Sequence, residues 1–108
     1  MVIDKATLLK NMALKTALIP MDGGDVSLKE LSAVEYMEVY NSLMDDKGEV
    51  DSDKLTSMLV VRSILDKKGQ RMFTDEEAKT LREGSSMRYA KLAIAVNKLH
   101  TPGTDLKN

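Results

Sequence analysis

The sequence predicts a mainly α-helical domain of about four to five helices, with one short β-hairpin near the N-terminus. Helix-capping signals precede several stretches in which apolar residues recur every three to four positions. One Asp-Gly-Gly turn separates two short segments of alternating apolar and polar residues. A chain of 108 residues with 43% hydrophobic content suits one domain. We expect that domain over residues 1–103, followed by a polar tail over 104–108.

The first element is a short amphipathic helix, expected over residues 4–15. Asp4 is placed to cap its N-terminus. Its apolar residues share one face, formed by Leu8, Leu9, Met12 and Ala13. The lysines of this segment lie elsewhere on the helix.

Residues 16–29 have the alternating pattern of two short strands around the turn at Asp22-Gly23-Gly24. Pro20 lacks a backbone donor and suits only an edge strand or the end of a strand. We therefore expect this β-hairpin to be a small appendage to a helical body.

A second helix is expected to begin after Ser32. Ser32 and Glu35 have the Ser-x-x-Glu spacing of a capping box, in which the hydroxyl and the carboxylate each bind a backbone N–H. The apolar stripe that follows consists of Tyr36, Val39, Tyr40, Leu43 and Met44. The helix should end near residues 45–48, because Gly48 can take the left-handed conformation.

A third helix is expected from Asp51 or Ser52 to about Lys67. Its apolar residues nearly encircle the axis, which predicts a central helix that packs on more than one side. Its β-branched residues leave a buried strand as the alternative: Val60, Val61 and Ile64. Gly69 should close this helix.

Two further helices are expected before the tail. Thr74 and Glu77 form a second capping box, which begins a brief helix ending at Gly84. Ser85 or Ser86 then caps the last helix. Its inward stripe is expected to be Tyr89, Leu92, Ala93, Val96 and Leu99.

The composition argues against an enzyme, and we expect no catalytic, cofactor-binding or metal-binding residues. The chain has no Cys and a single His, so it offers no thiol nucleophile, disulfide, thiolate metal site or His cluster. His100 is interpreted as a polar residue near a helix C-terminus. The acidic residues from 45 to 53 do not form a calcium loop, because Leu43, Lys47 and Lys54 would occupy ligand positions.

Charge and hydropathy point away from nucleic acid and membranes as partners. The chain has 16 Lys and Arg against 17 Asp and Glu, with both signs interspersed, so no basic face for a phosphate backbone is evident. No apolar stretch approaches the roughly 20 residues of a membrane-spanning helix, and no signal peptide is evident. A cytoplasmic protein is therefore expected.

Methionine is the one compositional excess, with eight residues. Thioether side chains fill irregular cores, and they also line surfaces that accept varied apolar partners. Core packing is the simpler reading for any single one. We select as candidates for partner binding or self-association Tyr36, Met37, Tyr40, Met44, Met72 and Phe73.

An ordered set of residues spans 61–99: Val61-Arg62-Ser63-Ile64-Leu65-Asp66, Gly69, Arg71, Phe73-Thr74-Asp75-Glu76-Glu77, Leu81, Ser85-Ser86 and Asn97. Upstream lie Ile19-Pro20, Gly23-Gly24 and the run from Val26 to Glu35. This order resembles the tail assembly chaperones of long-tailed bacteriophages, the siphophages.

The resemblance implies a non-enzymatic factor that binds the tape-measure protein in the host cytoplasm, keeps it soluble and is shed before the virion matures. It also implies a homo-oligomer, and a frameshift-extended form that recruits the tail-tube protein. A helical binder with an apolar groove, present in many copies, could cover a long helical chain reversibly.

The alternative is a helical DNA-binding or transcription-control module, with the fourth and fifth helices as a helix-turn-helix. Its phosphate contacts would be Arg82, Arg88, Lys91 and Lys98. The acidic start of the fourth helix, Asp75-Glu76-Glu77, weighs against this alternative.

Overall fold

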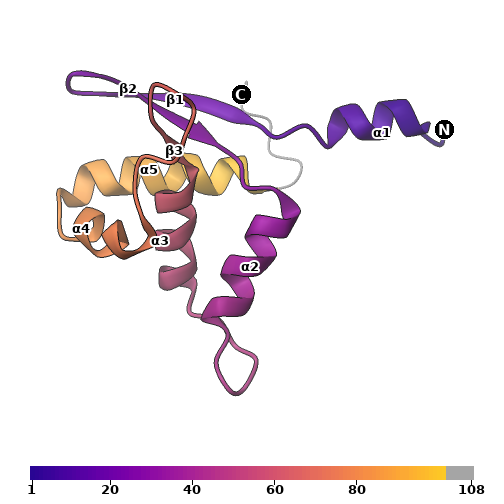
Figure 1. The fold of residues 1–108 in the computed structure, drawn as a ribbon. Coiled ribbons are helices and arrows are strands. Elements are labelled where there is room, and N and C mark those ends of the chain that lie inside the picture. Colours follow the sequence, from indigo (N-terminus) through magenta and orange to yellow (C-terminus); the bar gives the residue numbers. More distant parts are fainter. Residues whose placement is uncertain (102–108) are drawn as a thin grey trace.

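The computed structural model describes residues 1–101 of the chain (Figure 1). The elements are α1 (Lys5–Asn11), β1 (Thr16–Met21), β2 (Gly24–Lys29), α2 (Ala33–Leu43), α3 (Ser52–Ser63), β3 (Ile64–Leu65), the 3-10 helix η1 (Asp75–Glu77), α4 (Ala78–Arg82) and α5 (Ser86–Leu99). The expected domain end at residue 103 and the polar tail over 104–108 lie outside the described residues.

The predicted mainly α-helical class is wrong. The strands form a three-stranded antiparallel sheet in the order β1-β2-β3, so residues 1–101 form a small α/β domain with five α-helices and one short 3-10 helix. The β1-β2 hairpin is also not an appendage, because Leu28 of β2 is fully buried in the core (0% exposed).

The third strand lies where the sequence predicts the end of the third helix. Helix α3 ends at Ser63, and Ile64 then pairs with Leu28 while Leu65 pairs with Ser27. The buried-strand alternative therefore holds only for Ile64 and Leu65, the last two apolar residues of the predicted third helix. Gly69 does not close α3 but lies in the turn after β3, with a φ of 78°.

The hairpin itself follows its prediction. Gly23 and Gly24 both have positive φ, 92° and 146°, in the turn between the strands, and the pairing runs from Thr16 opposite Lys29 to Met21 opposite Gly24. Pro20 lies in β1, at the edge of the sheet, where a missing backbone donor is tolerated.

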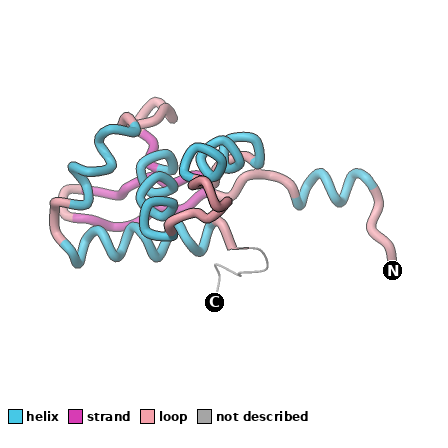
Figure 2. The backbone as a smooth tube through the Cα atoms, turned by 90° about the horizontal axis from the view of Figure 1, so that it is seen from below, coloured by secondary structure: helices cyan, strands magenta, loops and turns pink. Residues whose placement is uncertain are grey.

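Helices α2 to α5 lie on one side of the sheet (Figures 1 and 2). Helix α3 packs against both α2 and α5, and α5 also packs on β1, so the predicted central place of the third helix is confirmed. The core between these elements consists of Leu28, Leu31, Val39, Leu59, Val60, Ile64, Leu92, Val96 and Leu99. The inward stripe predicted for α5 supplies the last three of these residues.

The predicted helix starts are confirmed by side-chain caps. An oxygen of each capping residue accepts a first-turn N–H: Asp4 from Thr7, Ser32 from Glu35, Asp51 from Asp53 and Lys54, and Ser85 from Arg88. The capping box at Thr74 and Glu77 is also present, with the Thr74 N–H donating to Glu77 Oε1 at 2.8 Å. The helix ends are less well predicted, because α2 stops at Leu43, where the extended Met44 follows.

Residues 1–14, which carry α1, project from the body as an arm (Figures 1 and 2). Helix α1 buries no residue and makes no extensive contact with another helix or strand. The radius of gyration is 15.1 Å, above the roughly 13 Å of a compact domain of this length, and the projecting arm contributes to this excess.

No helix within residues 1–101 combines the length and apolar character needed to cross a membrane.

Candidate functional site: the hollow beside helix α2

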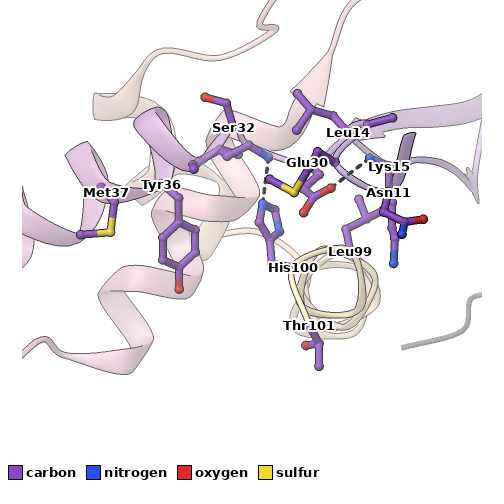
Figure 3. Close-up of a pocket in the computed structure, with 14 residues that line it drawn as sticks. Asn11, Leu14, Lys15, Glu30, Ser32, Tyr36, Met37, Leu99, His100 and Thr101 are labelled. Atoms are coloured by element: carbon purple, nitrogen blue, oxygen red, sulfur yellow. Dashed lines mark hydrogen bonds between the residues drawn. The ribbon is translucent and has the colours of Figure 1, made fainter. Parts of the chain in front are cut away.

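A hollow of about 630 Å³ opens between the base of the arm and the start of α2 (Figure 3). Its walls come from residues 11–15 at and after the end of α1, from residues 30–33 with Tyr36 and Met37 around the start of α2, and from residues 99–101 at the end of α5. The large apolar side chains of the lining are Met12, Leu14, Leu31, Tyr36, Met37 and Leu99. This combination is typical of a surface that accepts an apolar ligand segment.

Two hydrogen bonds between Lys15 and Glu30 fix the base of the arm. The Glu30 N–H donates to the Lys15 carbonyl oxygen at 2.8 Å, and the Lys15 N–H donates to Glu30 Oε1 at 3.0 Å. They extend the connection between β1 and β2 one residue beyond the pair Thr16 and Lys29. The arm therefore leaves the sheet in a set direction, which keeps the hollow open on one side.

His100 joins the end of α5 to the start of α2 at the floor of the hollow (Figure 3). Its Nε2 accepts a hydrogen bond from the Leu31 N–H at 2.9 Å, and its Nδ1 lies 2.8 Å from the Val96 carbonyl oxygen. A carbonyl oxygen only accepts, so Nδ1 carries the proton and the ring is neutral in this arrangement. Because both ring nitrogens are engaged, His100 has no free nitrogen for acid–base chemistry here.

An exposed apolar stripe continues from the hollow along α2. Val34, Met37 and Met44 have exposed fractions of 72%, 51% and 42%. Val34 and Met37 lie on the same side of α2, and Met44 is the extended residue that directly follows the helix. We refer to these three residues as the α2 face. Tyr36 and Tyr40 are half-buried between this face and the core.

The structure divides the six predicted binding residues between two surfaces and does not join them in one groove. Tyr36 and Met37 line the hollow beside the arm, whereas Met72 and Phe73 line a smaller hollow of about 430 Å³ formed by residues 71–76. Tyr40 and Met44 line neither hollow.

The first hollow is also lined by Met12, Leu14 and His100, which the sequence does not predict as binding residues. The apolar face expected around Met12 was the available signal. This apolar face indicates an amphipathic segment. It does not indicate which part of the fold that segment lies beside.

An ion-pair network holds α2, α3 and η1 together. Arg62 of α3 binds Asp75 through two hydrogen bonds of 3.2 and 3.0 Å and reaches Glu35 of α2 at 3.4 Å. Arg71 binds the same Asp75 carboxylate at 2.6 Å. The hydrogen bond from Arg62 is the main cause that lowers the pKa of Asp75.

The network explains why Glu35 does not complete the predicted capping box, and it shows how three of the ordered residues between 61 and 99 pair with one another. The Glu35 carboxylate pairs with Arg62, whereas the predicted capping box would have directed it back to the N–H of Ser32. Arg62, Arg71 and Asp75, which belong to the ordered residues that carry the family resemblance, meet in space as structural partners. Their mutual pairing leaves no isolated acid or base at this position.

The acidic loop after α2 has a structural role. Asp45 Oδ1 accepts hydrogen bonds from the N–H groups of Lys47 and Glu49, both at 2.9 Å, and so closes the turn that contains Gly48. Within residues 1–101, no group of three or more His, Cys, Asp or Glu side chains is arranged to hold a metal ion.

Two of the four cations considered for DNA binding contact the hairpin. Arg88 binds the Asp22 carboxylate at 2.7 Å, and the Lys91 ammonium group donates to the Pro20 carbonyl oxygen at 2.7 Å. These contacts attach the tip of the hairpin to α5.

No protein-family model, no curated protein and no solved structure matches this chain.

Proposed function

We propose that this protein is a non-enzymatic assembly chaperone, which covers an apolar helical segment of a larger partner. The observation that carries the proposal is the α2 face beside the open hollow. Val34 and Met37 expose more than half of their surface, although the core of the domain has formed without them. An apolar stripe that continues into a hollow fits an amphipathic helix of a partner.

The size of this surface favours reversible binding. Full burial of one Val or Met side chain contributes about 1.5–3 kcal/mol, and these side chains are already partly covered. Association also costs translational and rotational freedom. A few such contacts therefore give only weak binding at a single site. Many weak sites along one partner chain give strong total binding that can still be removed stepwise.

The charge around the α2 face further defines the partner segment. Residues 30–46 contain five Asp and Glu and no Lys or Arg, and only Glu35 among these acidic residues pairs with a cation within residues 1–101, Arg62 of α3. A segment with an apolar stripe flanked by Lys or Arg therefore complements this surface best.

The order of motif residues between 61 and 99 supports a specific partner, the tape-measure protein of a siphophage. On this proposal the protein acts in the host cytoplasm, coats the tape-measure chain as a homo-oligomer and is absent from the mature virion. A frameshift-extended form that recruits the tail-tube protein belongs to the same proposal.

Co-purification tests the proposal directly. The chain is co-expressed with the tape-measure protein encoded in the same genome, and the captured amount is compared for wild type and Met37→Glu. A charge at Met37 would have to be desolvated on binding, so capture should fall by about tenfold, which corresponds to about 1.4 kcal/mol. The matched control is Ile94→Glu on α5, where the exposed fraction is 57%.

Two results would overturn the proposal. The first is wild-type protein that does not capture the tape-measure protein. The second is Met37→Glu protein that has wild-type thermal stability and captures the partner as well as the Ile94→Glu control does.

A further inference from the structure

We propose that the arm of one copy, residues 1–14, docks on the α2 face and into the hollow of a second copy of this chain. The inference goes beyond the proposed homo-oligomer because it names the contact between copies, and it assigns the α2 face to the arm of a second copy when no partner helix occupies it. It rests on three observations about the arm: its uncovered apolar side chains, its charge, and the direction in which it leaves the body.

The arm has an apolar surface that its own chain does not cover. Leu8, Leu9 and Met12 have exposed fractions of 49%, 60% and 63%, and their spacing puts them on one side of α1. A helix of seven residues is too short to be stable in water without tertiary contacts. Burial of this apolar side against another surface therefore stabilises helix α1.

The charge of the arm complements the α2 side of the body. Residues 1–15 contain three Lys and one Asp, and Asp4 accepts the capping hydrogen bond from the Thr7 N–H. Lys5 and Lys10 form no ion pair within the described residues. The α2 segment itself carries no Lys or Arg. Glu35 pairs with Arg62, whereas Glu38, which lies on α2 next to Met37, is exposed.

The position of the hollow favours a second copy over the same chain. Residues 11–15 already form one wall of the hollow, and the bonds between Lys15 and Glu30 direct the arm away from the body. Leu8 and Leu9 lie beyond this wall and do not line the hollow. A second arm can enter between the first arm and α2, and two-fold symmetry then lets each copy receive the arm of the other.

Cross-linking of purified protein tests this arrangement. The chain has no cysteine, so a single introduced thiol has no competing background. Leu9→Cys chains and Met37→Cys chains that carry tags of different mass are mixed and treated with a short bismaleimide. We expect hetero-dimers that join position 9 of one copy to position 37 of the other.

The matched control replaces Met37→Cys by Ile94→Cys, an exposed site on α5. The yield of cross-linked dimer through position 37 should exceed the yield through position 94 by about tenfold. This is the ratio expected for a contact stabilised by about 1.4 kcal/mol. Equal yields at the two positions would overturn the proposal. So would a Leu9→Cys/Met37→Cys double variant that cross-links only within single chains, because that result places the arm on its own body.

The contribution of the arm lysines is tested separately by measuring the molecular mass of the protein in solution. Lys5→Glu/Lys10→Glu should weaken the dimer by about tenfold, since two ion pairs of up to about 1 kcal/mol each are replaced by repulsion. The wild-type dimer should also weaken as the salt concentration rises. A monomer at all concentrations, or a dimer indifferent to both changes, would contradict the proposal. The capture of tape-measure protein is measured separately, so failure of one proposal does not decide the other.

Discussion

At the scale of single residues, His100 has the most specific role in the site. The Leu31 N–H lies in the buried link between the sheet and α2, and the ring of His100 supplies its acceptor. A buried donor without an acceptor costs about 1–3 kcal/mol. His100 therefore couples the floor of the hollow to the stability of the fold.

We expect His100→Ala to lower the free energy of unfolding by about 1–3 kcal/mol, because the Leu31 N–H loses its partner. Urea unfolding measures this change. Lys98→Ala, at an exposed position in the last turn of α5, serves as control and should stay within about 0.5 kcal/mol of wild type. Equal stability of the two variants would show that the bond to Leu31 contributes nothing.

Asp75 is the residue through which the stability should depend on pH. Arg62 lowers its pKa in the folded protein below the ordinary value of 3.8. The folded state therefore holds the ionised carboxylate more strongly than the unfolded state does. Its contribution to stability is present above pH 3.8 and is lost as the pH falls through the lowered value.

We expect Asp75→Asn to destabilise the protein at neutral pH and to differ progressively less from wild type below pH 3.8. Urea midpoints across an acid pH series measure the difference. Asp46→Asn, at an exposed position, provides the comparison and should show a small difference at every pH. A difference for Asp75→Asn that stays constant with pH would contradict the assigned ion pair.

At the scale of elements, the β1-β2 hairpin is a structural part of the core. Leu28 in β2 is fully buried and faces the helices, whereas Leu18 in β1 is 66% exposed on the outer side. The two leucines thus share one hairpin and differ in their environment. This contrast distinguishes a core hairpin from an appendage.

Leu28→Ala should lower the free energy of unfolding by about 2–5 kcal/mol, the range for a buried leucine that leaves a cavity. Leu18→Ala should cost less than about 1 kcal/mol, because water already contacts most of that side chain. Thermal or urea unfolding of both variants measures the contrast. Similar losses for the two would mean that the hairpin does not contribute to the core as described.

At the scale of the whole molecule, the arm and the body are energetically separable. No residue from 1 to 16 is buried, and the arm is joined to the body at Lys15 and Glu30. The arm therefore contributes exposed apolar surface to the protein and little to the stability of a single copy.

Deletion of residues 1–14 should leave the Tm of dilute protein within about 3 °C of wild type, since no buried side chain is removed. Differential scanning calorimetry at several protein concentrations measures it. At high concentration the wild type should gain stability that the deletion variant lacks, because association stabilises the folded state by mass action. A large loss of Tm in dilute solution would show that the arm packs on its own body.

The amino-acid sequence by itself determined the local structure of this protein, namely its helix starts, its hairpin turn and the apolar side of α5. Asp4, Ser32, Asp51, Thr74 and Ser85 begin their helices as predicted, because a cap acts within three or four residues of the chain. The hairpin turn and the inward stripe of α5 are equally local, since each depends on backbone preference or on periodicity.

Only the tertiary structure decided the outcomes that depend on distant partners. Ile64 and Leu65 form a strand because β2 lies beside them, although their pattern also suits the end of a helix. Glu35 pairs with Arg62, a residue far along the chain. The hollow exists because three separate segments meet around His100, and the spacing of apolar residues shows that a face is apolar without showing what lies opposite it.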